Sequence, residues 1–294
     1  MQMRLMLLGG GNALGQALIR LGAEEDIGFL APCPPDKGWD ASSLTQLLDD
    51  NRPDVVINLA YYFDWFQSSR VDEAALANQE RAVERLAELC QHYQLVLLQP
   101  SSYRVFDGVR TTAYSEKDEV APLDARSRAL WCIEQTVRAL CPRHVLLRFG
   151  WLLDDSPNGL LGRFLRRLEQ GEKMALADDR RGNPTPVDDA ARVMLAVIKQ
   201  LDCQAPLWGT YHYGGQEAAT PLVVAQALYS EACQHRQLSL DCLVPIAHAD
   251  CDDAADEPQH GVLACKKIFN TFGIKPRAWR TGLPSLLEHY YRHG

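Results

Sequence analysis

Short apolar runs alternate with amphipathic stretches along the first half of the chain. The runs are rich in Val, Ile and Leu, as buried strands are, and the stretches between them repeat their apolar residues at helical spacing. The predicted strands are Arg4–Leu8, Ile27–Leu30, Asp54–Ala60, Leu95–Gln99 and His144–Phe149. The predicted helices are Asn12–Leu21, Ser42–Leu48, Glu73–Tyr93 and Ala125–Leu140. This alternation predicts an α/β fold, a Rossmann-type doubly wound parallel sheet with helices on both faces.

The rhythm changes after Trp151, where helices dominate and strands become short. The expected elements are helices at Leu160–Gln170, Asp188–Gln200, Pro221–Ala232 and Leu286–Tyr291, strands at Gly209–Gly214 and Leu243–Ile246, and an acidic loop at Ala249–Glu257. We therefore divide the chain into a doubly wound first domain, residues 1–150, and a smaller C-terminal lobe, mainly residues 151–294. A segment near residues 186–215 is expected to return to the first domain.

Charge and cysteine usage narrow the class of protein further. The net charge of −8 argues against a nucleic-acid partner. No apolar run approaches the roughly 18 residues that a membrane span needs, and the apolar opening runs straight into a glycine turn, so we interpret it as a strand. The nine cysteines include no Cys-x-x-Cys pair. An odd, unpatterned set of this kind indicates a reducing compartment, and it argues against a disulfide framework or a zinc site. We expect a cytoplasmic protein with no membrane partner and no bound metal.

A glycine-rich turn joins the first predicted strand to the first predicted helix. Gly9 and Gly15 bracket it in a Gly-x-x-x-x-x-Gly frame. Small residues there permit a tight turn, and a pyrophosphate can then lie against the helix N-terminus. The expected cofactor contacts of this turn are Gly9, Gly11, Asn12, Ala13 and Leu14. The expected cofactor is NAD or NADP. Asp36 favours NAD and Lys37 favours NADP, but both are also ordinary turn residues, so the sequence does not decide between the two cofactors.

Several further segments, in order along nearly the whole chain, carry short motifs. They are Arg52–Tyr61 (RPDVVINLAY), Ser101–Gly108 (SSYRVFDG), Tyr114–Glu116 (YSE), Pro122–Asp124 (PLD), Asp178–Asp179 (DD), Gly182–Thr185 (GNPT), Gly209–His212 (GTYH), Phe272–Ile274 (FGI) and Trp279. Together these motifs resemble the dTDP-4-dehydrorhamnose reductase branch of the extended short-chain dehydrogenases. Asn78 stands where that family has a Val-Asn before a helix. The resemblance implies hydride transfer from NAD(P)H to a nucleotide-linked keto-sugar, bound in a cleft between the dinucleotide-binding Rossmann domain, residues 1–150, and a small substrate-binding lobe, mainly residues 151–294.

The resemblance also implies which residues border the ligands. Leu59, Ala60, Tyr61 and Asn78 would border the cofactor. On the substrate side, Asn183 lies in a family motif. Arg180 and Arg181 could clamp a diphosphate bidentately, although a surface pair is an equal alternative.

The catalytic set departs from the family at two positions. The resemblance implies a Ser or Thr, a Tyr and a Lys, of which the Tyr protonates the alkoxide and the Lys lowers the pKa of that Tyr. Ser102 is kept, but Arg126 stands at the Tyr position and Leu130 at the Lys position, and no tyrosine of the chain has a lysine four residues later. An arginine stays protonated and is a poor acid near neutral pH. Tyr103, beside Ser102, is the best candidate for a relocated acid.

The glycine turn departs as well, because Asn12 replaces the middle glycine of the family's Gly-x-x-Gly-x-x-Gly. We expect its side chain to crowd the pyrophosphate, or Gly11 to take over the close approach. Two other features are predicted to be unrelated to a site: the acidic run Asp250–Glu257, as a solvated loop, and His289 with His293, as a frayed end. The aromatic residues Tyr61–Phe66 are either core or an altered pocket or protein-binding patch.

Two main hypotheses follow. The first is an NAD(P)-binding protein with a degenerate catalytic site that binds a nucleotide-sugar or another small molecule, as a regulatory member with a protein partner or as a homodimer. The second is an active NAD(P)H-dependent reductase that uses a relocated acid such as Tyr103. A scaffold without any cofactor is a third, against which the kept turn and Ser102 argue.

Overall fold

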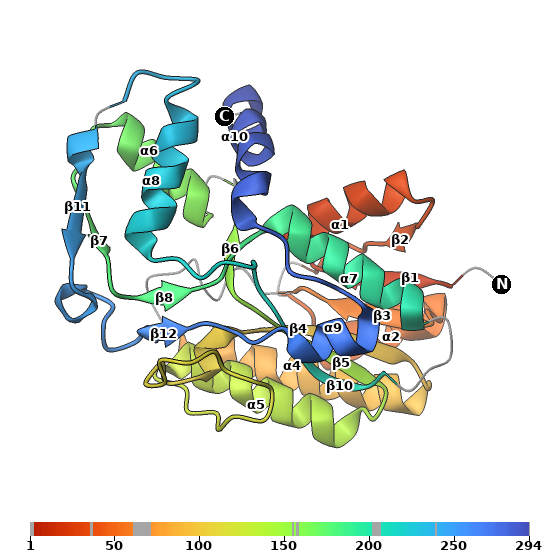
Figure 1. The fold of residues 1–294 in the computed structure, drawn as a ribbon. Coiled ribbons are helices and arrows are strands. Elements are labelled where there is room, and N and C mark those ends of the chain that lie inside the picture. The colour runs from red at the N-terminus through yellow and green to blue at the C-terminus, as the bar shows by residue number, and fades with distance from the viewer. Residues whose placement is uncertain are drawn as a thin grey trace.

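A parallel six-stranded sheet forms the centre of the protein (Figure 1). The computed structural model describes residues 3–35, 38–60, 72–154, 156, 159–201, 207–238 and 240–293. The strand order is β10-β5-β4-β3-β1-β2, and every neighbouring pair is parallel. The strands are β1 (Leu5–Leu8), β2 (Phe29–Leu30), β3 (Val55–Asn58), β4 (Val96–Ser102), β5 (His144–Phe149) and β10 (Gly209–Tyr213). The order reverses beside β1, so the carboxyl ends of β1 and β3 lie where such sheets bind ligands.

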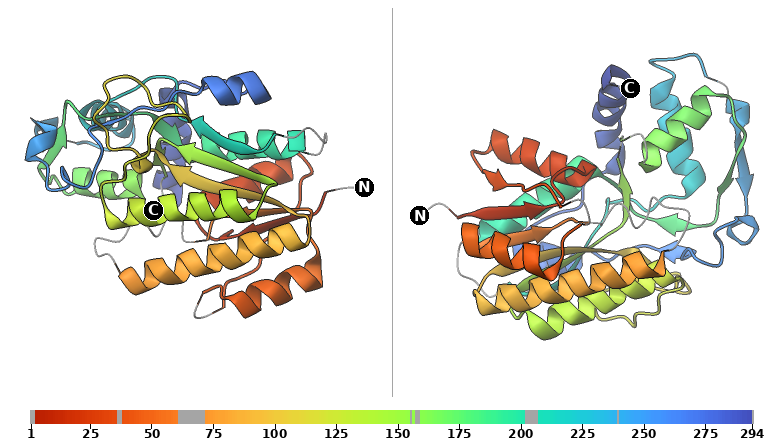
Figure 2. Two further views of the ribbon diagram at one scale, coloured as in Figure 1. Left: turned by 90° about the horizontal axis from the view of Figure 1, so that it is seen from below. Right: turned by 180° about the vertical axis from the view of Figure 1, so that it is seen from behind.

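Helices cover both faces of the sheet (Figures 1 and 2). On one face lie α1 (Ala13–Glu24) and α7 (Val187–Leu201), and on the other lie α2 (Ala41–Asn51), α4 (Glu73–His92) and α5 (Ala125–Leu140). Because both faces are covered, the central strands are buried throughout, and two apolar clusters form, one on each side of the sheet. The predicted doubly wound α/β fold is confirmed.

A smaller lobe stands on the carboxyl edge of the sheet. Its helices are α6 (Leu160–Glu169), α8 (Pro221–Ala232), α9 (Lys266–Phe272) and α10 (Leu283–His293). Its strands pair two by two and in parallel, namely β6 (Trp151–Leu153) with β9 (Pro184–Pro186), β7 (Met174–Ala177) with β11 (Leu243–Ile246), and β8 (Arg181–Gly182) with β12 (His260–Gly261). In Figure 1, α6, α8, β7 and β11 form the outer part of the lobe, while α9 lies against the sheet.

Most predicted elements occur within a few residues of their expected bounds. Ala125–Leu140, His144–Phe149, Pro221–Ala232 and Leu243–Ile246 have the predicted bounds. The second predicted strand shortens to Phe29–Leu30, and Leu286–Tyr291 lengthens to a helix over Leu283–His293. The aromatic run Tyr61–Phe66 and the pair Asp36 and Lys37 lie outside the described residues. Within the described residues, no helix is long and apolar enough to span a membrane.

Candidate functional site

The glycine turn is held tightly between the start of α1 and the end of β3. Gly9 has a φ of 82°, and a Cβ atom there would lie 2.5 Å from the carbonyl carbon of Leu59. A Cβ atom on Gly15 would lie 2.6 Å from the carbonyl oxygen of Gly9. Both positions therefore need glycine, Gly9 for its backbone conformation as well as for space. Leu59 is buried and Ala60 is half-buried beside the turn.

Asn12 is the N-cap of α1. Its Oδ1 accepts a hydrogen bond from the backbone N–H of Gly15 at 2.8 Å, and its Nδ2 donates to the carbonyl oxygen of Leu59 at 2.9 Å. The side chain is thus turned toward β3 and the first turn of α1. The sequence, in contrast, had suggested that it would crowd a pyrophosphate at the start of the helix. This geometry satisfies one of the N–H groups that an α-helix leaves unpaired at its start.

The turn fits the pyrophosphate of a dinucleotide. A Cβ atom on Gly11 would meet nothing within 4 Å, so the outer side of the turn is open. A cavity of about 970 Å³ lies beside it, lined by Gly11 and Ala13 and, across the gap, by residues of α10. The backbone N–H groups of Ala13 and Leu14 stand at the positive end of α1, where an anion is stabilised.

Two other expected cofactor contacts are Tyr61 and Asn78. Tyr61 falls outside the described residues. Asn78 lies inside α4, within the helix predicted over Glu73–Tyr93; it is exposed, and its Oδ1 accepts from the guanidinium of Arg81. Helix α4 begins at the predicted residue, Glu73, because Asp72 caps it, accepting hydrogen bonds from the backbone of Ala74 and Ala75.

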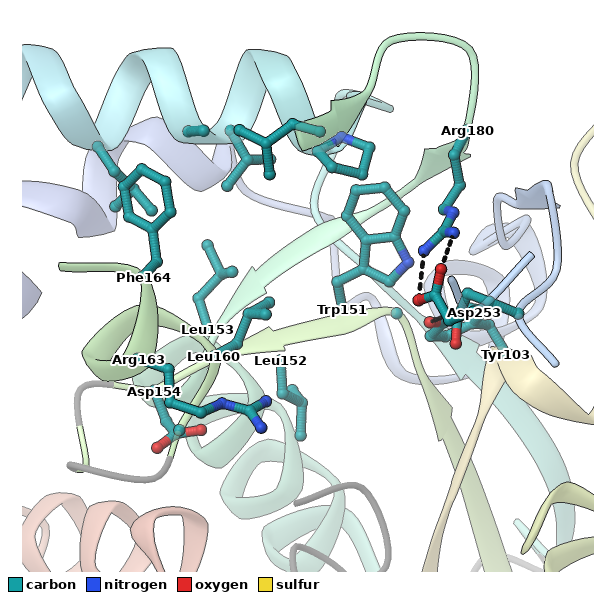
Figure 3. Close-up of a pocket in the computed structure, with 18 of the residues that line it drawn as sticks. Tyr103, Trp151, Leu152, Leu153, Asp154, Leu160, Arg163, Phe164, Arg180 and Asp253 are labelled. Carbon is teal, nitrogen blue, oxygen red and sulfur yellow. Dashed lines mark hydrogen bonds and ion pairs between the residues drawn. The ribbon is translucent and has the colours of Figure 1, made fainter. Parts of the chain in front are cut away.

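A cavity of about 380 Å³ opens where the sheet meets the lobe (Figure 3). One wall comes from the lobe and is mostly apolar, and Asp154 and Arg163 are its charged members. Its apolar members are Leu152, Leu153, Leu160, Phe164, Leu176, Pro221, Val224, Ala225 and Leu228. The facing wall carries Ser102, Tyr103, Arg104, Arg180, Asp253 and Glu257. Figure 3 shows Phe164 and Leu153 on one side, Arg180 and Asp253 on the other, and Trp151 between them. An apolar body with a few convergent polar groups is the ordinary form of a small-molecule site.

Ser102 and Tyr103 reach the cavity from the end of β4. Ser102 is buried, and its Oγ accepts a hydrogen bond from the backbone N–H of Arg104 at 3.3 Å. The ring of Tyr103 lies edge-on to Trp151 with centroids 6.5 Å apart, and it occupies the space above Gly261, where a Cβ atom would approach it to 2.3 Å. Because Gly261 on β12 has no side chain, the ring of Tyr103 can lie against its backbone.

The hydroxyl of Tyr103 donates to the carboxylate of Glu257, which is itself buried. Burial and the adjacent negative charge raise the pKa of Tyr103 well above its ordinary value. A catalytic tyrosine needs the opposite, a pKa lowered toward neutrality by a nearby cation. Burial and Glu257 therefore shift the pKa of Tyr103 in the opposite direction.

Arg104 fixes Glu257 in place. Its guanidinium contacts Glu257 Oε2 at 2.6 Å and Asp124 Oδ2 at 3.1 Å, and it donates to the carbonyl oxygen of Asp256 at 3.2 Å. Asp124 caps α5 through the backbone N–H of Ser127. The start of α5, the end of β4 and the segment before β12 are therefore joined at one corner of the cavity.

A second ion pair stands further along the same wall. The two Nη atoms of Arg180 contact the two carboxylate oxygens of Asp253 at 3.0 and 2.5 Å, and its Nε donates to Nδ1 of His248 at 3.0 Å. The prediction of a solvated acidic loop is therefore wrong for Glu257, which is buried against Arg104. Asp253 stays exposed, as predicted, although it pairs with the buried Arg180. A buried arginine needs a carboxylate partner, which explains why these two acidic residues face the cavity wall.

The residues at the family's Tyr and Lys positions lie on α5. Arg126 is half-buried in the first turn, and the charges of Asp124, Arg104 and Asp256 act on it. Leu130 is 2% exposed and belongs to the apolar cluster under the sheet. Neither residue is among those that line the cavity.

The three residues expected to bind the substrate lie in different surroundings in the structure. Arg180 lines the cavity, whereas Arg181, the next residue, is exposed on β8. Asn183 is buried, and its amide group serves the backbone, donating to the carbonyl oxygen of Gly215 at 2.8 Å and accepting from the N–H of Leu263 at 2.8 Å. Within the described residues, no group of three His, Cys, Asp or Glu side chains could hold a metal ion.

A buried ionic network behind Ser102 was not found from the sequence. Glu134 of α5 is fully buried and accepts hydrogen bonds from the guanidinium of Arg148 on β5 at 2.8 and 2.6 Å. It also accepts from Ser101 and, at 2.7 Å, from Arg138. The network holds α5 against β4 and β5. The sequence signal that could have indicated this network is Glu134 itself, a glutamate on the apolar stripe of the predicted helix Ala125–Leu140.

His212 extends this network and sets a pH dependence. Its Nδ1 lies 3.0 Å from the carbonyl oxygen of Tyr114, so Nδ1 carries the proton and Nε2 faces Arg148 Nη1 at 3.4 Å. Burial and the charge of Arg148 lower the pKa of His212 to about 3. The unfolded chain takes up a proton below about pH 6.5 and the folded chain does not, so this group alone should lower the free energy of unfolding by about 2 kcal/mol between pH 6.5 and pH 5.

Urea unfolding at these two pH values checks the prediction. We expect His212→Gln to flatten the dependence, while His92→Gln, at an exposed position of α4, leaves it unchanged. Equal pH dependences in wild type and His212→Gln would contradict it.

Fold and turn together define a Rossmann-type protein of the extended short-chain dehydrogenase class. Comparison with protein families gives the branch: residues 3–292 match the RmlD substrate binding domain. The chain belongs to this family.

Individual relatives match this chain over almost its full length and theirs. The chain is 26% identical to the dTDP-4-dehydrorhamnose reductase of Aggregatibacter actinomycetemcomitans, covering 96% of this chain and 98% of that protein. Among solved structures, the dTDP-4-dehydrorhamnose reductase of Clostridium acetobutylicum superposes with a TM-score of 0.84 at 20% identity, covering 98% of this chain and 100% of that one. The Bacillus anthracis reductase, solved in complex with NADP, gives a TM-score of 0.80 at 21% identity, covering 98% and 100%.

Proposed function

We propose that this protein binds NAD(P) and a nucleotide-linked sugar, as its relatives' names imply for them, but does not reduce the sugar efficiently. The observation that carries this proposal is the hydrogen bond from Tyr103 to the buried carboxylate of Glu257. This bond engages the hydroxyl of Tyr103, the phenol next to Ser102 within the described part of the chain, and so opposes its use as a proton donor. In this reading residues 1–150 hold the cofactor and the lobe, with the 380 Å³ cavity, holds the sugar nucleotide.

Binding is supported by groups that are kept. The turn at Gly9 to Gly15 keeps the shape that brings a pyrophosphate to the start of α1. If bound, NAD(P)H would supply the hydride. The residues of this chain would orient it through the N–H groups of Ala13 and Leu14, while Ser102 Oγ could donate a hydrogen bond to a sugar oxygen.

Turnover is opposed by groups that are changed. A developing alkoxide needs a proton from a group of suitable pKa, and such assistance is worth about 10²–10⁴-fold. Arg126 does not release a proton near neutral pH, and Leu130 cannot hold a ribose hydroxyl. These losses favour a binding or regulatory member of the family.

The alternative is an active reductase that uses Tyr103, and one observation favours it: the ring lines the cavity next to Ser102. Its raised pKa and its bond to Glu257 oppose this alternative. We also propose a cytoplasmic location, supported by the eight described cysteines, all of which are free thiols.

Two assays on the same preparation test the proposal. We expect NADPH to bind in a fluorescence titration and to raise the melting temperature. We expect no NADPH oxidation above background with dTDP-4-dehydrorhamnose, in wild type and in Tyr103→Phe alike. Turnover that disappears in Tyr103→Phe would establish the alternative, and absence of NADPH binding at millimolar concentration would contradict the proposal.

A further inference from the structure

We propose that Arg180 is the phosphate-binding residue of the 380 Å³ cavity and that Asp253 is its exchangeable counter-ion, which a phosphoryl group of the ligand must displace. This inference deepens the proposed function and rests on it, because it names the anionic part of a nucleotide-linked ligand as the group that Arg180 receives. Asp253 then determines how tightly that ligand binds.

Arg180 is built as a fixed cation. Its side chain is only 10% exposed, and Nε is held by Nδ1 of His248. His248 is fixed in turn, because its backbone N–H donates to Asp179 Oδ1 at 2.6 Å and its ring is buried. The guanidinium therefore stays in place whether or not Asp253 is bound to it.

Asp253 is the movable half of the pair. Its side chain is 56% exposed, and it belongs to a run of turns between η3 (His248–Asp250) and β12, where the structure has neither a long helix nor a strand. A carboxylate that solvent reaches this well contributes little to the pair. The other anchor of the segment, Glu257 with Arg104, is buried and would keep the segment attached when Asp253 moves.

The geometry of the exchange suits a phosphoryl group. The two Nη atoms that now face the two oxygens of Asp253 present the planar fork that also matches two phosphate oxygens. Figure 3 shows this pair at the edge of the cavity, on the far side of Trp151 from the apolar wall. A ligand with its apolar part against Phe164 and Leu228 would bring its anionic part to Arg180.

Isothermal titration calorimetry with dTDP tests the proposal on the full-length protein. Asp253→Asn should bind dTDP about fivefold more tightly than wild type, because the half-exposed carboxylate that competes with the ligand for Arg180 is removed. Arg180→Gln should bind at least about tenfold more weakly, because a charged hydrogen-bond donor is lost. The combined variant should resemble Arg180→Gln, since Asp253 acts only through Arg180.

Asp252→Asn is the matched control. It removes the same charge from the neighbouring, exposed position and should leave the dTDP affinity unchanged. Equal tightening by Asp252→Asn and Asp253→Asn would show a general charge effect and overturn the proposal, as would unchanged affinity in Asp253→Asn or no dTDP binding by any variant. An NADPH titration of the same samples separates the two claims, because it reports the cofactor turn alone and fails only if the proposed function fails.

Discussion

Replacing Glu134 by alanine is expected to lower the free energy of unfolding by about 3–5 kcal/mol, the usual effect of breaking a buried ion pair. Arg148 is 1% exposed and would be left without its carboxylate. The buried Ser101 and the partly exposed Arg138 would also lose their hydrogen bonds to Glu134, and His212, which faces Arg148, would lie beside an unpaired cation. Urea unfolding with fixed-slope analysis measures the change.

Two further variants make this prediction specific. Gln135→Ala, at the next and exposed position of α5, should change the free energy of unfolding by no more than about 0.5 kcal/mol. Glu134→Ala combined with Arg148→Met should be more stable than Glu134→Ala alone, because the fully buried charge of Arg148 is removed and only the partly exposed Arg138 lacks its carboxylate. A double variant that is less stable than the single one would contradict an origin in the buried charge.

The second large effect is expected at the glycine turn. Gly9→Ala should lower the free energy of unfolding by about 3 kcal/mol, because a side chain at positive φ is strained and the new Cβ atom would meet the backbone of Leu59. NADPH affinity should fall with it, since the start of α1 would be displaced from β3. Chemical denaturation and an NADPH titration measure the two effects.

Gly11→Ala is the matched control within the same turn. Its Cβ atom would meet no protein atom within 4 Å, so stability should stay within about 0.5 kcal/mol of wild type. A loss of stability equal to that of Gly9→Ala would contradict the packing described for the turn. A loss of NADPH affinity alone would show that Gly11 provides the close approach to the pyrophosphate.

Periodicity predicted the fold because each element carries its own pattern. Helix α5 and strand β5 have the predicted bounds, since a capping aspartate precedes the first and the apolar run of the second is continuous. Helix α4 also begins at its predicted residue, Glu73, because Asp72 caps it, so Asn78 lies inside the helix and not ahead of it, where the family resemblance placed it. Capping residues decide such boundaries more than periodicity does.

The polar wall of the cavity could not be predicted in this way. Tyr103 and Glu257 are 154 positions apart, and Arg180 and Asp253 are 73 apart. A pattern along the chain shows only that Asp250–Glu257 is acidic. Which of its members turn inward depends on the path of the loop and on the arginines it meets, and both are tertiary properties.

The glycine turn shows the same division between local and tertiary information. Its glycines and its place after the first strand were evident from the sequence. The bond from Asn12 to Leu59 joins residues 47 positions apart, and it turns the side chain away from the open side of the turn. Whether a substituted glycine motif can still accept a cofactor is therefore decided by a contact with β3 that the motif does not contain.

The most direct measurement is a single-turnover experiment in which the protein, loaded with one equivalent of NADPH, is mixed with saturating dTDP-4-dehydrorhamnose and the absorbance of NADPH is followed. Because the glycine turn is shaped to hold the cofactor while the hydroxyl of Tyr103, the phenol that lines the cavity among the described residues, is bound to Glu257, we expect the absorbance to decay no faster than in a mixture without the sugar. Rapid, stoichiometric oxidation of the bound NADPH would contradict the assignment of a site without a competent proton donor.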